Sequence, residues 1–229
     1  MKILKKFAEL FRPNKLPETV TIKQVAIFGY ADAPEDGELY ESVVAVSKRL
    51  AEAGYVVVDG GGPGVMRAAT VGAKQGGGEV LAVTLHPRDM THFEGRDPKN
   101  IFDKEIKTTT YIERTLTLME QGQVYVVFNG GTGTISEFGM AWGLARLYFG
   151  HHKPLILYGD FWHEITDAFR KNMLLRPEEL KVFKIVSSAD QVLEAIEQFK
   201  QELAAGKSAN IEPTRESDST KPEVIHTKT

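Results

Sequence analysis

The 229-residue chain contains no cysteine. This absence excludes a disulfide framework, a thiolate zinc site and a cysteine nucleophile. No apolar run approaches the length of a membrane span, and the N-terminus lacks an apolar signal core with a small-residue cleavage site, so we expect a cytoplasmic protein. An excess of positive charge is absent too. The formal net charge is -3, which gives the chain no overall attraction to nucleic acid.

The two ends of the chain differ in composition from its body. Residues 1–23 are predicted to form an amphipathic helix and a linker, because Ile3, Leu4 and Phe7 share one helical face and lysines cover the rest. This helix is expected to pack on the domain or on a sister subunit, with membrane contact as the alternative. Residues 205–229 have almost no large apolar side chains and are predicted to be disordered, since they cannot offset their ordering entropy.

Between these ends, residues 24–204 alternate short apolar strands with helices. Strands are predicted at 25–29, 55–58, 80–83, 124–128, 155–158 and 182–186, and helices at 39–53, 65–74, 111–121, 132–149, 161–171 and 190–204. Residues 86–108 are polar and are predicted to be irregular. Strands that are apolar throughout and separated by helices are typical of a parallel sheet covered on both faces. The sequence therefore predicts a single α/β domain with a Rossmann-like parallel sheet.

The most informative local motif follows the predicted strand at 124–128 and opens a helix. It comprises Gly130, Gly131, Thr132, Gly133 and Thr134. The first turn of a helix leaves backbone N–H groups unbonded and carries the positive end of the helix dipole, so it favours an anion. The glycines allow close approach to the backbone, and the threonines add hydroxyl donors. We predict a phosphate-binding loop, with close strand–helix packing as the structural alternative.

A second glycine cluster also lies between a strand and a helix. Gly60, Gly61 and Gly62 precede Met66, and Gly29 follows the first strand. The carboxyl ends of parallel strands face one crevice, so these loops are expected to line the same site as the phosphate loop. Each glycine could serve a structural turn, but three strand ends without side chains favour a ligand. We predict that these five residues bind substrate.

Two charged side chains, Arg114 and Glu137, are the candidates for chemistry. An arginine fork suits phosphate or sugar hydroxyls, although a surface salt bridge with Glu113 or Glu120 is the alternative. Glu137 lies near the start of the helix that the phosphate loop opens, where a carboxylate is favoured by the helix dipole alone. None of the histidines pairs with another ligand at metal-binding spacing, so no metal and no cofactor are expected.

Three motifs occur in order along the chain: the 60–62 glycines with Met66, the Glu113–Arg114 pair, and the 130–134 loop with Glu137. Together they resemble the LOG family, also called lysine-decarboxylase-like, over residues 24–200. The resemblance implies a Rossmann-like homodimer that hydrolyses nucleoside 5′-monophosphates to free base and ribose 5-phosphate. It assigns catalysis to Arg114 and Glu137 and the phosphate to the 130–134 loop. An apolar face at Phe138, Trp142 and Leu144 also predicts a homodimer, through helices 111–121 and 132–148.

Several positions depart from the usual family pattern: Tyr30, Asp59, Arg67, Ile112, Thr115 and Asn129. These departures favour an alternative function, a non-catalytic carrier of a nucleotide or of molybdenum cofactor on the same fold. The retained Arg114 and Glu137 favour the enzyme. A third alternative, binding of single-stranded DNA, would need a basic stripe interleaved with aromatic residues, which the body lacks. We therefore predict a nucleoside monophosphate ligand and no nucleic acid.

Overall fold

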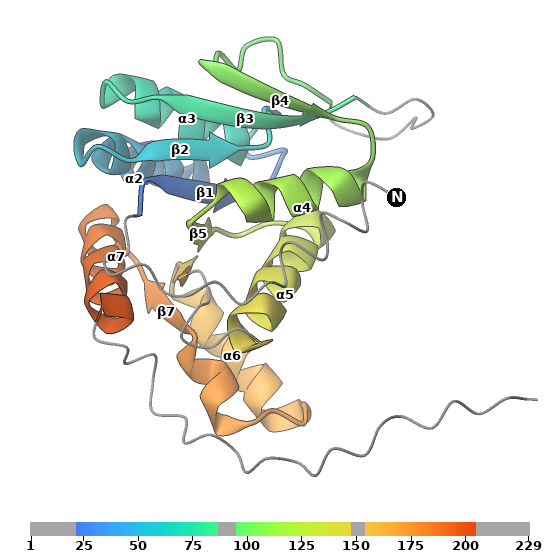
Figure 1. Ribbon diagram of the computed structural model, residues 1–229, viewed down its shortest axis with the longest axis vertical. Helices are drawn as coiled ribbons and strands as arrows, with labels where there is room; N and C mark the ends of the chain where they lie inside the picture. Colours follow the sequence, from blue (N-terminus) through green and yellow to red (C-terminus); the bar gives the residue numbers. More distant parts are fainter. Residues whose placement is uncertain (1–21, 87–94, 148–153, 205–229) are drawn as a thin grey trace, which may run out of the picture.

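The fold is a single α/β domain built on a parallel sheet (Figure 1). The structure is a computed structural model and describes residues 22–86, 95–147 and 154–204. The predicted N-terminal helix and C-terminal tail lie outside these residues. Seven parallel strands of the described chain form one sheet in the order β4-β3-β2-β1-β5-β6-β7: β1 (Gln24–Phe28), β2 (Val56–Asp59), β3 (Val80–Leu85), β4 (Lys104–Thr108), β5 (Val124–Val127), β6 (Leu155–Tyr158) and β7 (Phe183–Val186).

Helices cover both faces of this sheet, as predicted. They are α2 (Glu38–Glu52), α3 (Val65–Gln75), α4 (Tyr111–Gln121), α5 (Thr132–Leu147), α6 (Phe161–Asn172) and α7 (Ala189–Ala204), with the short 3-10 helix η1 (Pro177–Lys181) before β7. Alternate strand residues point to opposite faces. Val25 and Ile27 of β1 therefore join the core beneath α2, α3 and α7. Ala26 and Phe28 join the second core, beneath α4, α5 and α6.

The strand order reverses between β1 and β5. The chain moves outward from β1 through β2 and β3 to β4, and then returns to add β5 on the other side of β1. In such sheets the loops after the two strands at the reversal diverge and leave a crevice at the carboxyl edge. The loops that begin at Gly29 and Asn129 are those two loops. The fold thus brings two of the predicted glycine sites together.

The prediction that 86–108 is irregular was wrong at its end, where Lys104–Thr108 forms β4. This strand has one apolar residue, Ile106, among charged and polar ones, and it pairs only with β3, at the edge of the sheet. Charged residues on an edge strand discourage pairing with other chains, and they also remove the continuous apolar pattern that identified the other strands. The sequence pattern did not predict this strand because its edge position is defined only by the tertiary structure.

The aromatic face of α5 is part of the core and is not available to a partner chain. Phe138 is 2% exposed and packs on Trp162 of α6, with ring centroids 5.0 Å apart. Trp142 stacks on Phe169 and donates a hydrogen bond of 2.7 Å to the Glu179 carbonyl. The apolar pattern at 138 and 142 therefore reflects packing within the chain, and it carries no argument for a homodimer.

Candidate active site

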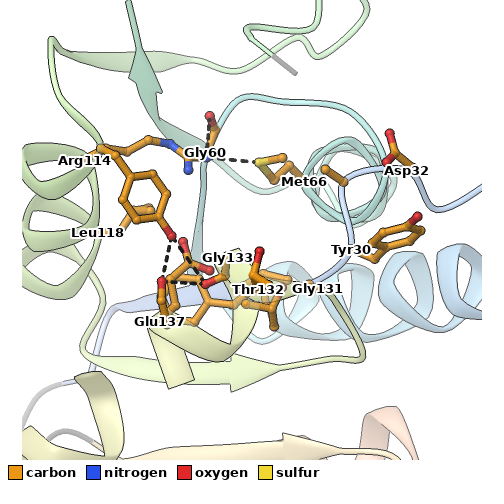
Figure 2. A pocket seen from close by; sticks show the side chains of 17 residues that line it. Tyr30, Asp32, Gly60, Met66, Arg114, Leu118, Gly131, Thr132, Gly133 and Glu137 are labelled. Carbon is orange, nitrogen blue, oxygen red and sulfur yellow. Dashed lines mark hydrogen bonds between the residues drawn. The ribbon is translucent and has the colours of Figure 1, made fainter. Parts of the chain in front are cut away.

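A cavity of about 530 Å³ opens at the carboxyl edge of the sheet, where the strand order reverses (Figure 2). Its wall is formed by the end of β1, by the loops after β1, β2 and β5, and by residues of α3, α4 and α5. The lining residues are Ile27, Phe28, Gly29, Tyr30, Ala31, Asp32, Gly60, Met66, Tyr111, Arg114, Leu118, Gly131, Thr132, Gly133, Thr134, Ser136 and Glu137. Most of the predicted site residues thus meet in one cavity of the size that holds a small ligand.

The predicted phosphate loop forms the N-terminus of α5, which begins at Thr132. Thr134 is buried with its hydroxyl against Gly130, where no side chain would fit. Gly131 and Gly133 are exposed, and a Cβ added at Gly131 would meet no atom within 4 Å. The loop is therefore packed against Thr134 at Gly130 and open to solvent at Gly131 and Gly133. Its first-turn N–H groups have the geometry of an anion site.

The loop after β1 is fixed between the two glycine-rich loops. Tyr30 donates a backbone hydrogen bond of 3.0 Å to the Asn129 carbonyl and accepts one of 3.0 Å from the Val65 amide. A Cβ at Gly29 would lie 2.7 Å from Val65, so only glycine fits between β1 and α3. These contacts hold three strand ends together. They also leave the Tyr30 side chain, 43% exposed, at one end of the cavity with Asp32 (Figure 2).

The second glycine loop contributes less surface than predicted. Gly60 and Met66 line the cavity, whereas Gly61 and Gly62 do not. Gly61 has a φ of +69°, a conformation that side-chain-bearing residues rarely adopt, and it packs against Thr84. This loop therefore shapes the wall of the cavity through its packing.

Arg114 lies inside the protein, with its guanidinium bonded to backbone carbonyls. It is 6% exposed and donates hydrogen bonds to the Val83 carbonyl at 3.1 Å and the Gly60 carbonyl at 3.3 Å. Its Nη2 also approaches the Met66 sulfur at 3.2 Å. Helix α4 orients it: Thr110 caps the helix by accepting from the Glu113 amide. A buried guanidinium is thus held at the cavity wall by two backbone carbonyls.

Glu137 is the second buried charge of the cavity, at 7% exposed. Burial raises the pKa of its carboxyl to about 7, against the lowering effect of the Arg114 charge. Among the described residues, no group donates a hydrogen bond to this carboxylate. Helix α5 has no acidic residue in its first turn, so capping does not explain Glu137. A carboxyl with a pKa near neutrality, in a cavity and beside an arginine, is typical of a catalytic group.

The sequence interpretation missed Tyr111, Ser136 and Asp32, which also line the cavity. The Tyr111 hydroxyl is 2.7 Å from the Ser136 hydroxyl and joins the first turns of α4 and α5. Spacing offered a clue, because Tyr111 precedes Arg114 by three residues and so shares its helical face. Asp32 had no such signal, since it lies in an irregular loop.

The departures from the family pattern occupy distinct environments. Arg67 forms ion pairs with Glu35 and with Asp97, the latter at 2.8 Å, and so joins the loops before α2 and before β4. Ile112 is 61% exposed on α4, and Thr115 is buried, with no hydrogen-bond partner for its hydroxyl among the described residues. None of these three residues lines the cavity.

Neither a metal site nor a transmembrane helix is found in the part of the chain that the structure describes. No three His, Cys, Asp or Glu side chains there are grouped to hold an ion. No described helix has the length and apolarity that crossing a bilayer requires.

The chain is similar in sequence to known proteins over more than half of its length. The chain is 31% identical over 133 residues to a cytokinin riboside 5′-monophosphate phosphoribohydrolase of Mycobacterium marinum, across 58% of this chain and 68% of that one. It is 28% identical over 138 residues to an uncharacterized protein of Archaeoglobus fulgidus, across 60% of this chain and 85% of that one.

Solved structures share the fold. A molybdenum cofactor binding protein of Rippkaea orientalis matches with a TM-score of 0.59 and 21% identity, across 79% of this chain and 99% of that one. A molybdenum cofactor carrier protein of Chlamydomonas reinhardtii matches with a TM-score of 0.54 and 21% identity, across 81% of this chain and 99% of that one. Residues 22–178 match the family described as the SLOG cluster4 family. The chain therefore belongs to this LOG-like family, as the three ordered motifs predicted.

Proposed function

We propose that this protein is a cytoplasmic phosphoribohydrolase, which cleaves the N-glycosidic bond of nucleoside 5′-monophosphates to give free base and ribose 5-phosphate. The observation that carries the proposal is the meeting of two buried charges, Arg114 and Glu137, beside an open helix N-terminus in one cavity. The mycobacterial relative, named for the same reaction on cytokinin riboside 5′-monophosphate, supports it.

The reaction follows from the positions of these groups. The α5 N-terminus binds the 5′-phosphate through backbone N–H groups and threonine hydroxyls. The C1′–N bond breaks, and its electron pair leaves with the base, which takes up a proton from solvent. The oxygen of a water molecule then bonds to C1′, and Glu137 accepts a proton from that water and later releases it to solvent. The ionised carboxylate also stabilises the positive charge that develops on the ribose.

Arg114 is assigned a positioning task toward the ribose or phosphate. Two carbonyl acceptors already fix its guanidinium, so little side-chain freedom remains to be lost on binding. Nucleic acid is not part of the proposal. Among the described residues that line the cavity, Arg114 is the only cationic side chain, whereas two carboxylates, Asp32 and Glu137, line it.

A chromatographic assay tests the proposal directly. The protein is incubated with a panel of nucleoside 5′-monophosphates and the matching nucleosides, and free base is separated by reverse-phase chromatography. We expect base to be released from at least one monophosphate and from no nucleoside. Arg114→Ala should lower both affinity and turnover, because it removes the positioning fork. A protein that binds monophosphates and releases no base from any of them would rule out the enzyme.

The second candidate function is a non-catalytic carrier of a nucleotide or of molybdenum cofactor. The observation that favours it is the altered surroundings of Arg114, where Ile112 points to solvent and Thr115 is buried without a hydrogen-bond partner among the described residues. The same assay separates the two functions, since a carrier binds its ligand without releasing a base.

We also propose a homodimer, on a surface different from the aromatic face of α5. Ile112 and Ile135 are 61% and 47% exposed beside the cavity. A Cβ added at Gly139 or Gly143, on the same helix as Ile135, would meet nothing within 4 Å. These four residues, the Ile135 stripe, offer an apolar surface that a second copy of the chain could cover.

A further inference from the structure

A buried carboxylate behind the cavity has no task in the reaction described above. Asp59, the last residue of β2, is 0% exposed and is not part of the cavity lining. It accepts hydrogen bonds from the Gly61 amide at 2.6 Å and the Thr70 hydroxyl at 2.9 Å. Removing a charged carboxylate from water is costly unless specific donors compensate it, so a purely apolar residue would fill this position at lower cost.

The loop that follows Asp59 is fixed through three consecutive carbonyl groups. The Gly60 carbonyl accepts from Arg114 at 3.3 Å, and the Gly61 carbonyl accepts from the Asp97 amide at 3.0 Å. The Gly62 carbonyl accepts from the Asn100 side chain at 2.9 Å. Asp59 fixes the amide side of the same loop through Gly61. Hydrogen bonds thus fix the loop at both its amide and its carbonyl groups. Through the Gly60 carbonyl, the loop in turn positions Arg114.

The Arg114 guanidinium packs directly against Gly60 of this loop. A Cβ at Gly60 would overlap the Nη2 atom of Arg114 and meet the Met66 sulfur at 2.6 Å. A small displacement of Gly60 therefore displaces the guanidinium. Since interiors are closely packed, such a shift is transmitted and not absorbed.

We propose that Asp59 is a positioning residue, whose carboxylate fixes the Gly60–Gly62 loop and, through the Gly60 carbonyl, holds Arg114 in place at the cavity wall. Its effect on turnover rests on the proposed function, whereas its effect on ligand binding does not. The ionised form performs this task, because only a carboxylate accepts from both Gly61 and Thr70 and also attracts the Arg114 charge.

The groups that face Asp59 determine the pH at which its carboxylate loses its hold on the Gly60–Gly62 loop. Thr70 faces it from α3, Asn100 from the loop before β4, Arg114 from α4 and the Gly61 amide from its own loop. Burial raises the pKa of the Asp59 carboxyl to about 6, and these four groups oppose that rise. As the pH falls through 6, Asp59 takes up a proton and its hold on the loop weakens.

The test compares Asp59→Asn with the wild type in calorimetric binding of adenosine 5′-monophosphate, which needs no turnover. At pH 7.5 we expect the variant to bind about ten- to a hundredfold more weakly, the range of one hydrogen bond to a charged group. At pH 5 the two proteins should bind alike, because the wild-type carboxyl is then protonated. The ligand phosphate is protonated to the same extent with either protein at a given pH, so its effect cancels in the ratio of the two affinities.

Asp103→Asn is the matched control. Asp103 also accepts from one backbone amide, that of Val80, and from one side chain, that of Lys74, but it does not line the cavity. We expect it to leave the affinity unchanged at both pH values. If Asp59 were purely structural, the ratio of wild-type to Asp59→Asn affinity would be the same at pH 5 and at pH 7.5, and the proposal would be wrong. Wild-type and Asp59→Asn affinities within twofold of each other at pH 7.5 would also overturn it.

Thr70→Val provides a second route if Asp59→Asn does not fold. It removes one donor and keeps the carboxylate, so the pKa of Asp59 should rise. The pH at which affinity begins to fall should then move upward from its wild-type value. An unchanged pH dependence in this variant would count against the positioning role. If all variants behave as expected in binding and no protein releases base, the enzyme proposal fails and the positioning proposal stands.

Discussion

The two glycine-rich loops look alike in sequence but differ in structure. Both follow a buried strand and open a helix. In the loop at 130–134, Gly131 has nothing within 4 Å of its Cβ position, and Gly133 meets only the Tyr111 hydroxyl at 3.6 Å. In the loop at 60–62, every glycine faces packed atoms of Arg114, Thr84 or Met66. An open loop can receive a ligand, and a closed one can hold a side chain, so surroundings and not composition decide what a glycine loop does.

The largest effect is expected at Glu137, which lies on the helix of the open loop. Glu137→Gln keeps the shape of the side chain but removes the proton acceptor and the negative charge. Positioned acid–base catalysis contributes about two to four orders of magnitude, and we expect a loss of turnover near the upper end. Affinity for the monophosphate should remain near that of the wild type. Initial rates of base release and calorimetric affinities check both parts, and an active variant would contradict the role assigned to Glu137.

The same substitution should stabilise the fold at high pH. The pKa of Glu137 is about 7 in the folded protein against 4.5 ordinarily, so between these pH values the folded state keeps a proton that the unfolded state has lost. Burial therefore costs stability that grows from pH 4.5 to 7, reaching about 3 kcal/mol above pH 7. Glu137→Gln should raise the free energy of unfolding by up to that amount at pH 8 and not at pH 4. A role limited to the helix dipole predicts the opposite sign, a loss of about 0.3 to 1 kcal/mol.

One substitution in each loop tests the comparison itself. Gly131→Val should fold normally, because its side chain enters open space, yet abolish the preference for a monophosphate over its nucleoside by blocking backbone approach. Removing such contacts is expected to weaken monophosphate binding by about ten- to a hundredfold. Gly60→Ala should instead displace Arg114 and destabilise the fold by about 1 to 3 kcal/mol through overpacking. Calorimetry measures the affinity of both variants, and denaturant unfolding measures their stability. If the two variants showed the same changes in affinity and stability, the difference between the two loops would be contradicted.

The smallest change in stability is expected on the Ile135 stripe. Ile135→Glu replaces an exposed side chain and should alter the free energy of unfolding by no more than about 0.5 kcal/mol. It should nevertheless convert the proposed homodimer to a monomer, because a partner would have to bury the new charge. Light scattering at micromolar concentration measures this, and a wild-type monomer under those conditions would refute the dimer.

The Arg114 example shows what sequence spacing cannot reveal. Two of its partners are the carbonyls of Val83 and Gly60, which are remote in sequence and are brought together by β2 and β3. A backbone carbonyl carries no residue-specific signal, so a nearby glutamate in the sequence remained an equally good partner. The Arg67 ion pairs with Glu35 and Asp97 are another long-range set of this kind.

The sequence by itself determined the described strands other than β4, the α-helices and the position of the glycine loop at 130–134, because each depends on local pattern: apolar runs, helix periodicity and glycines at a strand-to-helix junction. The tertiary structure decided which charges are buried, which glycines face the cavity, and that Lys104–Thr108 is an edge strand. It also placed Phe138 and Trp142 in the core. These properties depend on what packs against a residue from distant parts of the chain, and burial from such neighbours is what raises the pKa of Glu137 and Asp59.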